Sequence, residues 1–235
     1  MNLFDFPPLA AVLDAASTAL TALGGAVTPA LAIVLVTLVI RAALIPLSIA
    51  TVRAEGHRRR LAPQLARLRT RYAKQPERLQ RETLALYAAE KVSPFAGLLP
   101  GLAQAPVLTL VYALFTSATI HGHANSLLAA TVFGAPLGRH LIAATVGFLA
   151  GDWVALVLLA VIAVVAVLSR RAARRIALPV EPGQQRLADV LSFLPFLTVV
   201  FAAFVPLAAT LYLAVSTTWT LAERSLMRRA LWTAP

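Results

Sequence analysis

The chain has no cysteine among its 235 residues, and only 13% of the residues are charged. The missing thiols exclude disulfide bonds, cysteine-ligated zinc and cysteine nucleophiles. Soluble domains carry about 25% charged residues, whereas this chain is 59% hydrophobic with a mean hydropathy of +0.78. This composition excludes an ordinary soluble globule and a disordered chain. It favours a protein with several membrane-spanning helices.

The charges that are present are mostly basic and come in blocks. Lys and Arg number 21 against 10 Asp and Glu, which gives a net charge of +11. Eleven of the basic residues lie between Arg53 and Lys91, five lie between Arg170 and Arg186, and no charged residue occurs from Val92 to Leu137. Long neutral apolar runs are typical of transmembrane helices, and Lys and Arg concentrate in cytoplasmic loops.

The blocks predict an all-α polytopic membrane protein with five spans, its N-terminus outside and its C-terminus in the cytoplasm. Residues 1–26 lack the basic start of a signal peptide and predict an amphipathic helix on the outer face. The predicted spans are 27–52, 97–118, 152–169, 188–205 and 206–226; the predicted cytoplasmic parts are 53–96, 170–187 and the tail 227–235.

The predicted outer loop, 119–151, contains two apolar stretches that are too short to span a bilayer at about 1.5 Å per residue. Gly134, Pro136 and Gly138 interrupt them. We expect a helix that lies against the bundle here, with a hidden extra span as the alternative.

The cytoplasmic segment 53–96 predicts a basic helical hairpin. Leu61, Leu65 and Leu68 follow helical spacing, and Pro76 suits the first turn of a second helix. Its charge is explained equally well by anchoring at the cytoplasmic face or by a docking surface for a ribosome, a nascent chain or acidic lipid.

Arg41 lies in the middle of the first predicted span. An arginine near the bilayer centre costs about 2.5–3.5 kcal/mol on insertion scales, so an intramembrane arginine is a functional candidate by default. No Asp or Glu within another predicted span is an obvious partner, which indicates that Arg41 faces a water-filled cavity.

Polar residues on three predicted spans share faces that could enclose such a cavity. At about 100° per residue, Thr37, Arg41 and Ser48 lie on one side of the first span. Tyr212, Ser216, Trp219 and Glu223 do so on the last span, and Thr109, Tyr112 and Thr116 do so on the second. The predicted lining of this hydrophilic groove is Arg41, Thr37, Ser48, Gln104, Tyr112, Tyr212, Ser216 and Trp219.

Three segments resemble the YidC/Oxa-type membrane protein insertases in their compact five-span bacterial form. Val39–Leu47 (VIRAALIPL) is similar to the family's first-span segment with its intramembrane arginine. Ser93–Val107 (SPFAGLLPGLAQAPV) is similar to the family segment N-P-x-x-G-C-L-P-x-x-x-Q-x-P-V, with Leu98 at the usual cysteine. Phe204–Thr220 (FVPLAATLYLAVSTTWT) is similar to the family's final span.

The resemblance implies an insertase and chaperone of the bacterial inner membrane that is not an enzyme and uses no cofactor. Its groove would open to the cytoplasm and to lipid, and Arg41 would attract the polar segment of a nascent membrane protein. The substrate helix would then leave along the third and fifth spans into the bilayer. The Sec translocon and the ribosome are left open as partners, since the tail 227–235 lacks the long basic extension of some members.

Other functions have weaker support in the sequence. A small-solute channel or transporter is the main alternative, although no internal repeat and no acidic coupling-ion site is present. A hydrolase would need a nucleophile elbow or metal ligands, and His121 and His123 are expected to be solvated rather than to bind metal. Direct recognition of nucleic acid is not expected, because stacking aromatics do not alternate with the basic residues.

Overall fold

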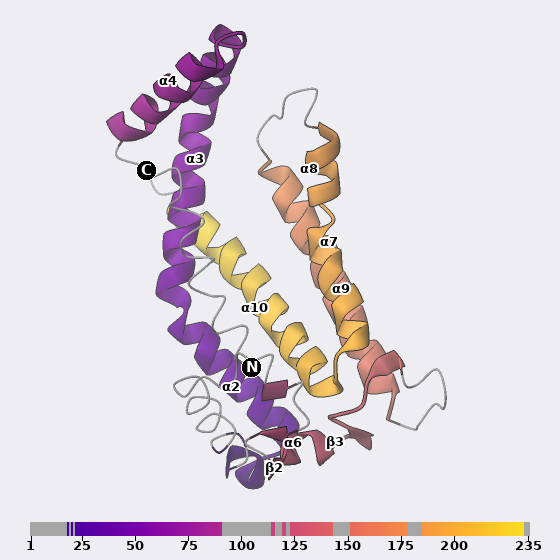
Figure 1. The fold of residues 1–235 in the computed structure, drawn as a ribbon. Helices are drawn as coiled ribbons and strands as arrows, with labels where there is room; N and C mark the ends of the chain where they lie inside the picture. The colour runs from indigo at the N-terminus through magenta and orange to yellow at the C-terminus, as the bar shows by residue number, and fades with distance from the viewer. Residues whose placement is uncertain are drawn as a thin grey trace. The chain divides into compact units, whose positions relative to one another are not determined.

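Figure 1 shows the protein as a computed structural model, in which residues 18, 20, 22–90, 114–115, 119–120, 123–142, 151–177 and 185–232 are described. These residues are mostly helical. The helices are α2 (Pro29–Ala43), α3 (Ile45–Arg71), α4 (Pro76–Ala89), α6 (Ser126–Ala129), α7 (Trp153–Arg175), α8 (Gln185–Leu191), α9 (Leu194–Phe204) and α10 (Leu207–Trp232). The strands are β1 (Thr119–Ile120), β2 (His123–Ala124), β3 (Thr131–Val132) and β4 (Ala135–Pro136).

The chain divides into two compact units, and each is described by itself. The first unit comprises Met1–Ala43 and Val107–Ala222, and the second unit comprises Leu44–Pro106 and Glu223–Pro235. Helix α10 therefore begins in the first unit and ends in the second.

Helices α2 and α3 are separated at Leu44, although apolar residues continue through this stretch. Pro46 lies in the first turn of α3. The amides of a first turn have no partner within the helix, so proline, which has no N–H, is well suited to this position. The amides of Leu47 and Ser48 both donate to the carbonyl oxygen of Leu44, at 3.1 Å. The predicted first span, 27–52, thus consists of two helices joined by a bend.

In the second unit, α3 and α4 form a helical hairpin (Figure 1). Pro76 and Glu77 occupy the first turn of α4, where a fixed φ and a negative charge both favour the start of a helix. The ring of Tyr72 is buried at the connection, with the guanidinium groups of Arg71 and Arg78 at 5.6 and 5.0 Å from its centroid. The contact from Arg78, a residue of α4, holds the two helices together where the chain reverses.

The end of α10 packs against α3 within the same unit. Arg228 donates from Nη2 and Nε to Oε2 of Glu55, at 2.9 and 3.1 Å. The indole Nε1 of Trp232 donates to the carbonyl oxygen of Val52 at 3.3 Å. An ion pair and a backbone hydrogen bond therefore fix the last turn of α10 on the first charged turns of α3.

In the first unit, the apolar core joins α2, the start of α10 and the segment around β3 and β4. The rings of Phe115 and Tyr212 lie 6.0 Å apart in this core. Its buried residues include Ala32, Ile33, Leu114, Phe115, Leu137, Val154, Leu207, Ala208, Ala209 and Tyr212.

The loop that follows β4 completes the start of α10. The first amides of a helix have no partner within the helix. Here the amide of Leu207 donates to the carbonyl oxygen of Arg139, and the amide of Ala208 donates to that of Leu137, both at 2.9 Å. The loop therefore stabilises the first turn of α10 without a capping side chain.

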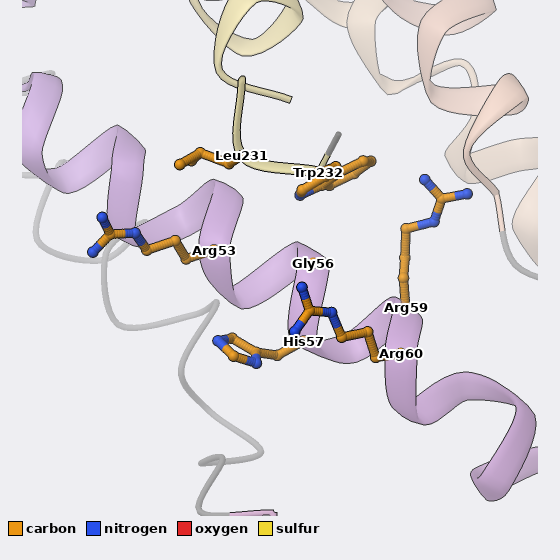
Figure 2. Close-up of a pocket in the computed structure, with 7 residues that line it drawn as sticks. All are labelled: Arg53, Gly56, His57, Arg59, Arg60, Leu231 and Trp232. Carbon is orange, nitrogen blue, oxygen red and sulfur yellow. The ribbon is translucent and has the colours of Figure 1, made fainter. Parts of the chain in front are cut away.

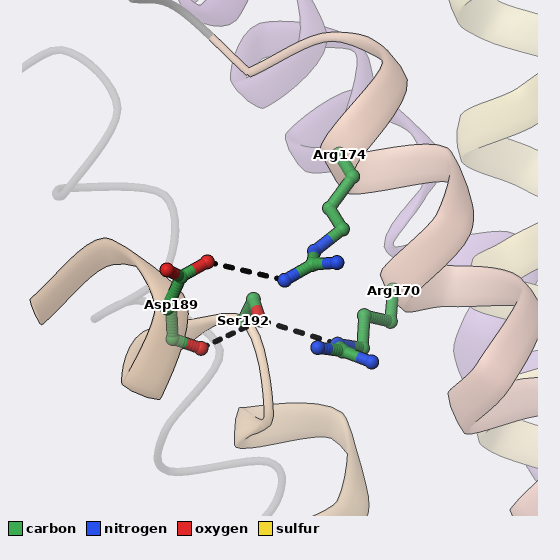
Figure 3. Close-up of polar contacts among 4 residues, drawn as sticks. All are labelled: Arg170, Arg174, Asp189 and Ser192. Atoms are coloured by element: carbon green, nitrogen blue, oxygen red, sulfur yellow. Dashed lines mark hydrogen bonds and ion pairs between the residues drawn. The ribbon is translucent and has the colours of Figure 1, made fainter. Parts of the chain in front are cut away.

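Helices α7 and α9 pack side by side (Figure 1), with Ile162 and Ala202 buried in the contact. Polar contacts continue beyond this apolar contact, at the end of α7 (Figure 3). Arg170 donates from Nε to Oγ of Ser192 at 3.1 Å, and Nη2 of Arg174 lies 3.1 Å from Oδ1 of Asp189. The guanidinium of Arg170 also lies 3.7 Å from the ring centroid of Phe193. These contacts connect α7 to the end of α8 and to the turn that follows it.

Among the described residues, two helical stretches are long and apolar enough to cross a membrane, Trp153–Ile176 and Gln185–Phe204. The bent pair α2 and α3 would make a third if it forms one span. Both stretches also expose large apolar side chains that suit contact with lipid; Val164 and Phe201 are 58% and 56% exposed. Of the predicted second span, 97–118, only residues 114 and 115 are described.

The described part of the predicted outer loop contains two short β-ladders as well as helix. β1 pairs with β2 and β3 pairs with β4, both antiparallel, and α6 forms a single turn between them. Phe133 and Gly134 make the tight turn between β3 and β4 with φ of 48° and 84°. Strands of two residues are too short for an alternating sequence pattern, so the all-α prediction did not include them.

Gly151 lies where the backbone before α7 meets this turn. A Cβ at Gly151 would lie 2.7 Å from the carbonyl carbon of Gly134 and 2.8 Å from Cα of Ala135. We expect Gly151→Ala to destabilise the protein by about 1–3 kcal/mol, the usual cost of overpacking. Gly25→Ala is the matched control, because nothing lies within 4 Å of its added methyl group. Thermal unfolding in detergent, with the folded fraction measured by size-exclusion chromatography, compares the two variants. Equal unfolding midpoints would contradict the prediction.

Candidate functional site

Arg41 lies in the last turn of α2 with its side chain partly buried. A cation at this position interacts favourably with the negative end of the helix dipole. Its guanidinium donates from Nε and from Nη2 to the same atom, Oγ of Ser216, and the Nε–Oγ distance is 2.9 Å. The structure therefore provides a neutral acceptor for Arg41, on a helix distant in sequence.

No ion pair joins Arg41 to a carboxylate within the described ranges. A hydroxyl acceptor holds the guanidinium in place but does not neutralise it. The five N–H donors of an arginine also exceed what one oxygen can accept. Arg41 therefore keeps its full positive charge and has donors left for a further polar group.

Ser216 is 2% exposed and lies in the middle of α10, so the contact with Arg41 is an interior one. Trp219 and Glu223 follow it at intervals of three and seven residues, which places them on the same face of α10. Nε1 of Trp219 and Oε1 of Glu223 are buried and have no hydrogen-bond partner in the described part of the protein. Buried polar atoms are normally paired, so this face of α10 has unused hydrogen-bonding capacity.

Two other predicted lining residues have side chains engaged in packing. Thr37 is 1% exposed, and its hydroxyl donates to the carbonyl oxygen of Ile33 in the preceding turn at 2.6 Å. Tyr212 is 6% exposed and packs in the apolar core against Phe115. Both residues lie in the same unit as Arg41.

The remaining predicted lining residues are not brought to Arg41 by the described structure. Ser48 belongs to α3, beyond the break at Leu44, so the shared-face argument from helical spacing covers only Thr37 and Arg41 on α2. Gln104 and Tyr112 lie outside the described residues.

Sequence reasoning missed an ion pair elsewhere in the first unit. Arg139 donates to Asp152 through two contacts, Nε to Oδ1 at 2.7 Å and Nη2 to Oδ2 at 3.0 Å. The sequence did contain a signal for this pair, because Arg139 and Asp152 are each a single charge in a long neutral stretch. Two lone opposite charges in an apolar environment are expected to pair.

The described site contains a cation, hydroxyls and an indole. No cluster of three or more His, Asp or Glu side chains that could hold a metal ion occurs in the described ranges. The arrangement is suited to binding a carboxylate or backbone carbonyls of another chain by charge-assisted hydrogen bonds.

The apolar helices and the arginine of α2 that is bonded to α10 define a multi-pass membrane protein with a partly buried cationic site. The chain matches the family described as "60Kd inner membrane protein" over residues 22–233. It therefore belongs to that family, which is the YidC/Oxa type that the sequence resembles, and is a multi-pass protein of a bacterial inner membrane.

Individual relatives carry the name "Membrane protein insertase YidC". The protein of Histophilus somni strain 2336 is 31% identical over 201 residues, and that of Pasteurella multocida strain Pm70 is 29% identical over 201 residues. Each match covers 86% of this chain and 33% of the relative. The protein of Clostridium perfringens strain 13 is 38% identical over 87 residues, or 37% of each chain. The matches thus span about a third of the length of these relatives.

Proposed function

We propose that this protein is a membrane protein insertase and chaperone, in which Arg41 receives the polar segment of a nascent membrane protein. The observation that carries the proposal is the guanidinium of Arg41, which is held by a neutral serine and retains its charge within an apolar helical protein. Family membership and the names of the relatives support the same activity.

The proposed topology has five spans, with the N-terminus outside and the C-terminus in the cytoplasm. The basic blocks at 53–96 and 170–187 support it through the positive-inside rule. Helices α2, α10 and the second span, 97–118, would enclose a hydrophilic groove open to the cytoplasm. The unpaired indole nitrogen of Trp219, in the same unit as Arg41, supports a groove that water or substrate enters.

The proposed mechanism makes and breaks no covalent bond. A polar segment that binds near Arg41 crosses less hydrocarbon on its way to the outer face. For an acidic segment, the membrane potential adds about 2.3 kcal/mol per charge per 100 mV. The apolar helix of the substrate then enters lipid along α7 and α10, and burial of its apolar surface drives its release into the bilayer.

The proposed partners are nascent membrane proteins and the lipid bilayer. The Sec translocon and the ribosome would be further partners in the same process of membrane protein insertion. The basic hairpin of α3 and α4 is the surface that such an assembly would meet first, because its arginines lie on exposed faces.

Site-specific photocrosslinking tests this proposal. A photoreactive amino acid placed at position 212, which leaves Arg41 in place, should crosslink to a stalled nascent single-span protein in membranes. The same probe at Leu197, which is 50% exposed on α9, is the control for random contact within the bilayer. Crosslinks that are stronger from position 197 than from position 212 would contradict a substrate path beside Arg41.

A further inference from the structure

A basic pocket lies where α3 meets the end of α10, entirely within the second unit (Figure 2). Its volume is about 460 Å³. The side chains around it are three arginines, a histidine and two apolar residues: Arg53, Arg59, Arg60, His57, Leu231 and Trp232.

The positive charge of this pocket is not neutralised by the described protein. Glu55 is the acidic residue of this turn of α3, and it is already paired with Arg228. No ion pair joins Arg53, Arg59 or Arg60 to any described carboxylate, and all three are exposed. Clustered guanidinium groups with free donors match the geometry of a phosphate group.

The apolar wall of the pocket is held in a fixed position. Trp232 is hydrogen-bonded to Val52, and the guanidinium groups of Arg59 and Arg228 lie 4.9 and 5.6 Å from its ring centroid. The ring approaches α3 closely because position 56 is glycine. A Cβ there would lie 2.9 Å from the indole nitrogen of Trp232.

The position of the pocket along α3 matches the boundary of a bilayer. Val52 is the last residue of the apolar stretch, and Arg53 is the first charged residue after it. From Arg53 to Arg60 the helix rises about 10 Å at 1.5 Å per residue, which is comparable to the thickness of one headgroup layer. Tryptophan and arginine side chains are both common at that level of a membrane protein.

We propose that this pocket is a binding site for one anionic glycerophospholipid, with phosphatidylglycerol as the probe. The arginines would hold the headgroup phosphate, and Leu231 and Trp232 would contact the glycerol and upper acyl chains. RNA phosphate is the less favoured ligand, because base stacking needs an accessible aromatic face, and guanidinium groups already lie over the ring of Trp232. The proposal requires a membrane protein but does not depend on insertase activity.

Native mass spectrometry of the full-length protein in neutral detergent tests the site, with phosphatidylglycerol and phosphatidylcholine titrated separately. The double variant Arg53→Gln, Arg60→Gln should lose about tenfold or more of its affinity for phosphatidylglycerol, with phosphatidylcholine unaffected. The matched control is Arg69→Gln, Arg81→Gln, which removes the same charge from exposed positions of the same hairpin outside the pocket. Equal losses in both double variants would show diffuse attraction and overturn the site.

A second variant tests the geometry without changing the charge. Alanine is the better helix former, so Gly56→Ala should leave α3 intact while it displaces Trp232. It should weaken phosphatidylglycerol binding several-fold, and unchanged affinity would contradict a role for the aromatic wall.

Inorganic phosphate and a short single-stranded RNA, added at matched phosphate concentration, complete the test. Failure of both to displace phosphatidylglycerol supports a lipid site, whereas displacement by either would overturn it.

Discussion

Arg41→Ala should abolish complementation of a cell depleted of its own insertase. A charge-assisted hydrogen bond contributes about 1.5–3 kcal/mol, which corresponds to about a 10- to 100-fold change in rate. We therefore expect insertion of a substrate with an acidic outer segment to fall by about 10- to 100-fold. The measurement is protease protection of a single-span substrate in reconstituted vesicles, together with growth of the depleted strain.

The loss should come from function and not from failure to fold. An arginine in a membrane span costs about 2.5–3.5 kcal/mol on insertion scales, so its removal should not lower the amount of protein in the membrane. Arg69→Ala is the control, since Arg69 is exposed on α3 in the second unit. Full complementation by Arg41→Ala for every substrate tested would contradict the proposed mechanism.

Lysine at position 41 should largely preserve activity. Arg41 directs two donors to one oxygen atom of Ser216, so the contact does not need the paired geometry of a guanidinium opposite a carboxylate. The positive charge, which lysine keeps, is what attracts an acidic segment. Ser216→Ala should have a smaller effect than Arg41→Ala, because it releases the guanidinium without removing its charge.

Asp152→Ala should cause the largest loss of stability among the substitutions considered. The side chain of Asp152 is 5% exposed and that of its partner Arg139 is 21% exposed. Removing one partner of a buried pair typically costs about 3–5 kcal/mol. The partial exposure of Arg139 places the expected cost near the lower end of that range.

The position of this ion pair explains why its loss should spread. Asp152 directly precedes α7, and the carbonyl oxygen of Arg139 accepts the first amide of α10. The pair therefore joins the starts of two helices through one loop. Weakening it should loosen the first turn of α10 as well as the start of α7.

Thermal unfolding in detergent, with a double-mutant cycle over Arg139 and Asp152, measures the expected coupling. Arg174→Ala is the matched control, because its pair with Asp189 is exposed, with side-chain exposures of 52% and 70%. An exposed pair contributes about 0–1 kcal/mol. An Asp152→Ala variant as stable as Arg174→Ala would contradict a structural role for the buried pair.

The sequence indicated the class of protein and its family because both depend on local composition and motif. Long neutral stretches between basic blocks predict membrane helices whatever the packing, and the family match confirms the resemblance read from Val39–Leu47, Ser93–Val107 and Phe204–Thr220. The importance of Arg41 also followed from the sequence, since a charge in an apolar stretch is costly wherever its side chain points.

The tertiary structure decided which groups meet. The acceptor for Arg41 lies 175 positions away in Ser216, and helical spacing can place each residue on a face without bringing the two faces together. The pairing of Arg139 with Asp152 is of the same kind. Each depends on how distant segments pack, whereas a sequence pattern reports only the periodicity of one segment.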